Sequence, residues 1–99
     1  MYVGVLTLDL LLGDVHSLKE KRSVVRPLIA ELKRVSNASV AEAGMLDLHR
    51  RALIGVAVVG TDASFCRQVL DTCERAVSAR PECELLSARQ RFISEEDED

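Results

Sequence analysis

Apolar residues dominate the first dozen positions of the chain, and their order predicts a β-strand. Over residues 2–12 (YVGVLTLDLLL), three leucines at alternate positions share one face, whereas Val5, Thr7 and Asp9 share the other. Both faces are apolar near the start, as expected of a central strand that is covered on both sides. Gly13 and Asp14 end this strand.

The next segment predicts an amphipathic helix. Ser17 and Glu20 have the spacing of a capping box, in which each side chain bonds a free N–H of the first turn. Pro27 falls inside the pattern, so it predicts a kink or a second helix start. Asn37 suits the C-cap. The apolar stripe consists of Leu18, Val25, Leu28, Leu32 and Val35.

The second half of the chain repeats this order of elements. Residues 39–42 predict a short strand, and residues 52–59 (ALIGVAVV) predict a second central strand without charge. Thr61 or Asp62 is the N-cap of a helix that ends at Arg80 and Pro81. Residues 83–93 predict a last strand, polar enough for a sheet edge. The helix's apolar face holds Phe65, Cys66, Val69, Leu70, Cys73, Ala76 and Val77.

The order strand–helix–strand–strand–helix–strand predicts an α+β fold of the ferredoxin-like type. Such a βαββαβ sandwich has a four-stranded antiparallel sheet, with strands one and three in the centre and two helices on one face. We expect one domain over residues 1–93. Five of the last six residues are acidic, so residues 94–99 predict a disordered tail.

The composition narrows the classes of function. Hydrophobic residues make up 47% of the chain and aromatic residues 3%, so the core is aliphatic and rings for stacking on bases are scarce. The formal charge is −3, yet without the tail the body carries 13 basic against 11 acidic residues. No stretch is long and apolar enough for a membrane span. Three cysteines without a CxxC pair suit a reducing cytoplasm.

Two surfaces are candidates for partners. The sheet face without helices is rich in aliphatic residues, which predicts a homo-oligomer or a docked protein there. Its candidate interface residues are Val3, Val5, Val56 and Val58. The first helix carries six of the 13 basic residues, and Lys19, Arg22 and Arg26 share a face with Lys21 near its rim. Such cations can neutralise phosphates of RNA, although a merely solvated helix face is the alternative.

Residues 47–51 hold the remaining candidates. Arg50 and Arg51 extend the predicted basic surface, which gives a predicted nucleic-acid-binding set of Lys19, Lys21, Arg22, Arg26, Arg50 and Arg51. Asp47 and His49 have the spacing of an acid–base pair in an extended loop. No nucleophile, paired carboxylates or metal-ligand spacing accompany them. We therefore expect no catalytic residues, no cofactor and no metal.

The string Ser17-Leu18-Lys19-Glu20-Lys21-Arg22 after an apolar strand, together with Gly55-Val56-Ala57-Val58-Val59, resembles the YlxP-like family of small bacterial proteins of unknown function. The resemblance covers the chain to about Ile93 and implies a ferredoxin-like fold in the bacterial cytoplasm. Relatives are often encoded beside genes for translation and ribosome maturation, which implies possible ribosome association. Members commonly carry a more polar stretch with a tryptophan between Glu42 and Arg51, where this chain has His49.

Overall fold

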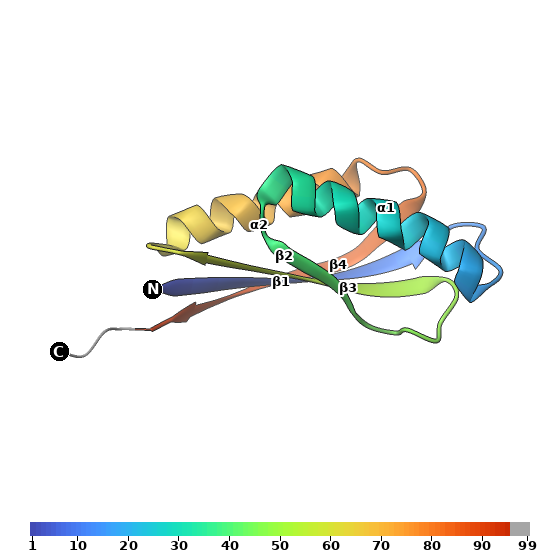
Figure 1. Ribbon diagram of the computed structural model, residues 1–99, viewed down its shortest axis with the longest axis horizontal. Helices are drawn as coiled ribbons and strands as arrows, with labels where there is room; N and C mark the ends of the chain where they lie inside the picture. The colour runs from blue at the N-terminus through green and yellow to red at the C-terminus, as the bar shows by residue number, and fades with distance from the viewer. Residues whose placement is uncertain (96–99) are drawn as a thin grey trace.

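The computed structural model describes residues 1–95 and shows a four-stranded antiparallel sheet with two helices on one face (Figure 1). The elements follow the predicted order. They are β1 (Tyr2–Leu12), α1 (Leu18–Ser36), β2 (Ser39–Gly44), β3 (Arg51–Gly60), α2 (Ala63–Ser78) and β4 (Cys83–Ser94). The strand order is β2-β3-β1-β4, so the two apolar strands are central, as predicted for the ferredoxin-like fold.

The core lies between the sheet and the two helices. The leucines at even positions of β1 are fully buried, as are Ala52 and Ile54 of β3, because alternate residues of both strands point toward the helices. Burial of each such leucine contributes about 1.5–3 kcal/mol to folding. The helices contribute Val25, Leu28, Leu32, Leu70, Cys73 and Val77 to the same cluster.

Both helices begin at the predicted caps. The Ser17 hydroxyl accepts from the Glu20 N–H at 3.1 Å, and the Glu20 carboxylate accepts from the His16 N–H, one residue before the expected cap N–H. Asp62, not Thr61, caps α2. The helix α1 continues through Pro27 without a second start. Pro27 has no N–H to donate to the Ser23 carbonyl, and both residues are exposed, so solvent can reach this part of the helix.

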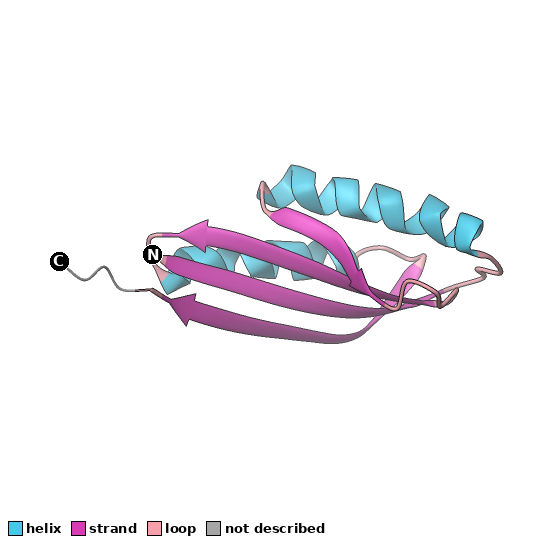
Figure 2. Ribbon diagram, turned by 60° about the horizontal axis from the view of Figure 1, so that its bottom comes forward, coloured by secondary structure: helices cyan, strands magenta, loops and turns pink. Residues whose placement is uncertain are grey.

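Two details differ from the sequence expectations. Phe65 was expected on the buried face of α2 but is 47% exposed. Its ring lies over Gly60, so close that a Cβ atom on that glycine would clash with it. The strand β1 was expected to be covered on both faces. Among residues 1–95 only one face is covered, by the two helices, and the apolar outer face has no second layer over it (Figure 2).

The chain termini meet at one end of the sheet. The Met1 ammonium donates to the Glu95 carbonyl at 3.0 Å, and the Glu95 N–H donates to the Met1 carbonyl at 2.8 Å. β4 thus extends one residue past the expected domain end, to Ser94. Residues 96–99, most of the predicted disordered tail, lie outside the described residues.

Candidate nucleic-acid interface

Three of the predicted cations form a strip on the outer side of α1. Lys19, Arg22 and Arg26 are exposed and, with Ser23 and Pro27, line a shallow depression of about 420 Å³. Within residues 1–95, no carboxylate oxygen comes within 4.0 Å of these three cationic groups. Their charge is therefore available to an anionic partner.

Lys21 does not belong to this strip, and its expected place on the exposed rim is wrong. Its side chain is buried under the loop after β2, and the residue is only 2% exposed. The Nζ atom lies 2.9 Å from Glu42 Oε2 and donates to the Met45 carbonyl at 2.7 Å. The Lys21 ammonium therefore links α1 to β2 and to the loop after it, instead of facing solvent.

The sequence contained a signal for this inward position. Lys21 falls on the apolar stripe of α1, three residues after Leu18 and four before Val25, which is the spacing of a buried helix face. A cation on such a stripe needs a partner because an unpaired buried charge is costly. Glu42 of β2 is that partner.

The loop over residues 45–50 lies beside the start of α1. Met45 has a left-handed backbone (φ 57°), and its carbonyl accepts from Lys21 Nζ and from the Leu48 N–H. Such a conformation is costly for a residue with a side chain, so the surrounding contacts must hold it. A depression of about 300 Å³ separates the loop from the helix, lined by Leu18, Lys21, Arg22, Glu42, Leu46 and Asp47.

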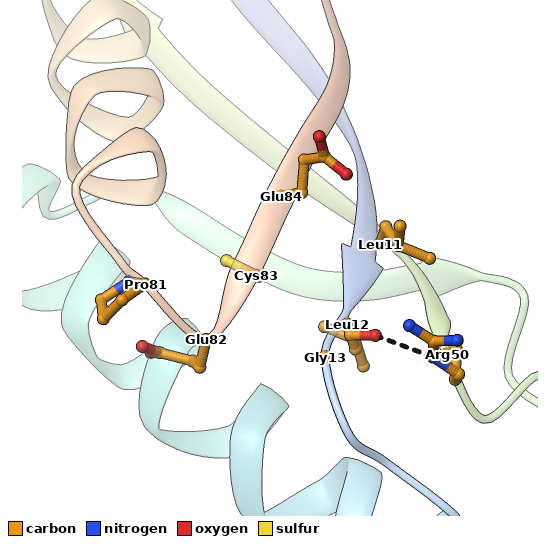
Figure 3. A pocket seen from close by; sticks show the side chains of 8 residues that line it. All are labelled: Leu11, Leu12, Gly13, Arg50, Pro81, Glu82, Cys83 and Glu84. Carbon is orange, nitrogen blue, oxygen red and sulfur yellow. Dashed lines mark hydrogen bonds between the residues drawn. The ribbon is translucent and has the colours of Figure 1, made fainter.

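Arg50 and Arg51 face other parts of the molecule. The Nε of Arg50 donates to the Leu12 carbonyl at 3.2 Å, beside a cavity of about 180 Å³ between the ends of β1 and β4 (Figure 3). The Nη2 of Arg51 lies 2.7 Å from both carboxylate oxygens of Asp9, on the sheet face opposite the helices. The six predicted cations therefore do not form one surface.

The Arg51–Asp9 pair explains the one charged residue of β1. Asp9 lies directly opposite Leu53, and Arg51 lies opposite the neighbouring Leu11 in the ladder between β1 and β3. The side chain of Asp9 is 22% exposed and that of Arg51 is 36% exposed, so water screens the pair in part. Sequence alone suggested only that Asp9 meets some basic residue.

The loop carries no assembled acid–base pair. Asp47 and His49 are both exposed, and only Asp47 lines the depression beside Lys21.

Burial raises the pKa of the Cys73 thiol, which disfavours the thiolate that a nucleophile requires. Among residues 1–95, no group of three or more His, Cys, Asp or Glu side chains is arranged to hold a metal ion.

The helix-free sheet face is aliphatic with charged margins. Val3 and Val5 lie on it, as predicted, whereas Val56 and Val58 point toward the helices, so their assignment to this face is wrong. The register of the two strands explains the error. Val3 pairs with Val59, so the odd-numbered residues of β3 share the helix-free face with those of β1, and the even-numbered ones face the helices. Near the chain termini, the exposed Val59 and Ile93 flank the half-buried Val3, and the three are neighbours across β3, β1 and β4.

Comparisons with known proteins agree with this fold and place the chain in a family. The family model described as "Protein of unknown function (DUF503)" matches residues 3–90, so the chain belongs to that family. The chain is 27% identical over 91 residues to "Uncharacterized protein YlxP" of Bacillus subtilis (strain 168), covering 92% of this chain and 99% of that protein. The expected YlxP-like resemblance is thereby confirmed.

A solved structure supports the architecture. The de novo designed protein Foldit4 superimposes with a TM-score of 0.56 at 14% sequence identity, over 97% of this chain and all of that one. At this identity the likeness shows the fold alone. Within residues 1–95, neither helix combines the length and apolar character that crossing a bilayer requires.

Proposed function

We propose that this protein acts in the cytoplasm as a small binding protein for RNA, in free form or in the ribosome, and that it has no catalytic activity. The observation that carries the proposal is the strip of Lys19, Arg22 and Arg26, three exposed cations without carboxylate partners among residues 1–95. Arginine and lysine contacts to phosphate supply most of the affinity of sequence-independent RNA binding.

The position of the strip favours phosphates over bases. Its residues are three and four apart on one helix, so their charges face the same side. The two phenylalanines belong to other elements: Phe65 lies in α2 and Phe92 in β4. Without an aromatic side chain in the strip, stacking on unpaired bases is not supplied, and recognition of the RNA backbone is favoured.

The size of the strip fixes the expected salt dependence. Neutralising three phosphates gives a slope of about −2 for single-stranded and about −2.7 for duplex RNA in a plot of log affinity against log salt. The affinity should therefore fall by about 20- to 40-fold between 50 and 200 mM salt. Fluorescence anisotropy with a labelled ribosomal RNA fragment measures this slope.

Two matched variants test which cations act. Arg22→Gln with Arg26→Gln removes two charges from the strip, whereas Lys33→Gln with Arg75→Gln removes two exposed charges elsewhere. The first variant should lose at least tenfold in affinity and flatten the salt slope by about 1.4–1.8, and the second should bind like the wild type. Equal binding by all three proteins would refute the proposal. Lys21 is unsuitable for this test because it is buried.

A second candidate function is self-association or protein docking through the helix-free sheet face, without RNA. It rests on the aliphatic patch of the half-buried Val3 with Val59 and Ile93, in which Val59 is 61% and Ile93 46% exposed. An assembly held by such a patch persists at high salt, because burial of apolar area is not screened. Val59→Asp should dissociate it in sedimentation experiments at 1 M salt. A monomer in 1 M salt before any substitution would exclude self-association by this patch.

A further inference from the structure

The outer edge of β4 is open to another strand. β4 lies at the end of the sheet and pairs with β1 alone among residues 1–95. Met1 and Glu95 exchange both backbone hydrogen bonds, so the polar groups of Glu95 face β1. Because this direction alternates along a strand, the N–H and C=O groups of Phe92 and Ser94 point outward, to the free edge.

The side chains along this end of β4 form a self-complementary series. Every second residue, which shares the helix-free face, is basic at Arg89 and Arg91, aliphatic at Ile93 and acidic at Glu95. Read in the opposite direction, the series exchanges basic for acidic positions around Ile93, as an antiparallel copy of the strand requires.

We propose that two copies of this chain pair antiparallel through β4, with the two-fold axis at Ile93. Ile93 then meets its counterpart, and Arg91 lies opposite Glu95 of the second copy. The outward groups of Phe92 exchange hydrogen bonds with those of Ser94 across the axis. The charged pairs fall at the positions without backbone bonds, where opposing side chains are closest.

The charges and the contact between the two Ile93 side chains favour this alignment over its neighbours. An axis at Phe92 would pair Arg89 with Glu95, but it would place Arg91 opposite Ile93 and separate the two isoleucines. An axis at Arg91 would place that residue opposite itself, and an axis at Gln90 would place Arg89 opposite Arg91. An axis at Ser94 would place Ile93 opposite a carboxylate. Arg91 has no carboxylate oxygen within 4.0 Å in residues 1–95, so it is free to pair with Glu95 across the axis.

The two ends of the pair allow a charge-exchange test. Arg91→Glu and Glu95→Arg each place like charges opposite one another at both symmetric positions, so each variant alone should dimerise about tenfold more weakly. Mixed in equal amounts, the two variants regain opposite charges at both positions and should form a heterodimer. Sedimentation velocity at 50 mM salt measures the masses, and circular dichroism shows that each variant is folded. Arg75→Glu, an exposed reversal on α2, is the matched control.

The mixture decides the proposal. Recovery of the dimer only in the mixture supports pairing through β4 with this axis. A mixture that sediments like the separate variants would overturn the proposal, as would a wild-type chain that remains monomeric at about 1 mM. The result is independent of RNA binding, because Arg22 and Arg26 lie on α1. It is also distinct from association through the sheet face, because Val59→Asp leaves the edge of β4 intact.

Discussion

Replacement of Lys21 by methionine tests the buried ion pair between α1 and β2. Methionine keeps most of the volume of the lysine stem but removes the ammonium, so packing is nearly retained. The variant loses the 2.7 Å hydrogen bond to the Met45 carbonyl and the 2.9 Å contact with Glu42. The Glu42 carboxylate then remains without its counter-ion.

The expected cost follows from these two losses. A hydrogen bond from a charged donor contributes about 1.5–3 kcal/mol. Breaking a buried ion pair costs about 3–5 kcal/mol, but Glu42 is 23% exposed and water compensates part of this, which leaves about 1–2 kcal/mol. The sum is about 2.5–5 kcal/mol, and its middle value of about 4 kcal/mol corresponds to a fall in Tm of about 16–32 °C for a domain of this size.

Urea unfolding followed by circular dichroism measures this free energy. Lys19→Met is the matched control, because Lys19 lies on the same helix and is exposed, and it should change stability by less than about 0.5 kcal/mol. Adding Glu42→Gln to Lys21→Met removes the orphaned charge and should recover about 1 kcal/mol. If Lys21→Met costs no more than Lys19→Met, the inward ammonium has no structural role and the reasoning is wrong.

Three further predictions concern stability. Gly4→Ala should cost about 1–3 kcal/mol in urea unfolding, because a Cβ there would lie 3.0 Å from the Cβ of Cys66; Gly13→Ala, which meets nothing closer than 3.7 Å, is its control, and equal costs would contradict the packing argument. Ser17→Ala should cost about 1 kcal/mol by removing the cap of α1, whereas Ser17→Asp should retain it, and an unchanged Ala variant would exclude a capping role. Burial raises the pKa of Cys73 in the folded state, so above about pH 8.5 only the unfolded thiol ionises and stability falls; Cys73→Ala should lessen this alkaline loss, and parallel pH profiles of the two proteins would contradict it.

Most of the fold followed from the sequence because its periodicities are clear. Alternating leucines specify the buried face of β1, and a capping box marks the start of α1 within one residue. The pairing of strands was less accessible, because it depends on contacts between distant segments. β1 pairs with β3 so that Val5 lies opposite Ala57, not Val56 or Val58, and this placed the odd positions of both strands on the same face. A shift of one residue in the assumed strand pairing assigned Val56 and Val58 to the wrong sheet face.

The charges were harder to place than the apolar residues. An arginine or lysine is predicted to be exposed unless its carboxylate partner is known, and the carboxylate partners of Lys21 and Arg51 lie far away in sequence. Asp9 and Arg51 are 42 residues apart, and Lys21 and Glu42 belong to different elements. Only the fold brings each pair together, so residue type could identify the cations but could not divide them into paired and free groups.

That division determines which surfaces can act. Lys21 and Arg51 are neutralised within the domain, and Arg50 holds the end of β1, so they add little to an electrostatic surface. Two of the groups of exposed cations without a carboxylate partner among residues 1–95 carry the proposals, one on α1 and one on β4. A phosphate backbone needs several cations on one face, which α1 supplies, whereas a strand edge adds backbone hydrogen bonds and a fixed spacing of side chains. The two proposed partners, RNA on α1 and a second copy at the edge of β4, therefore call on different surfaces, so the two proposals can be tested separately.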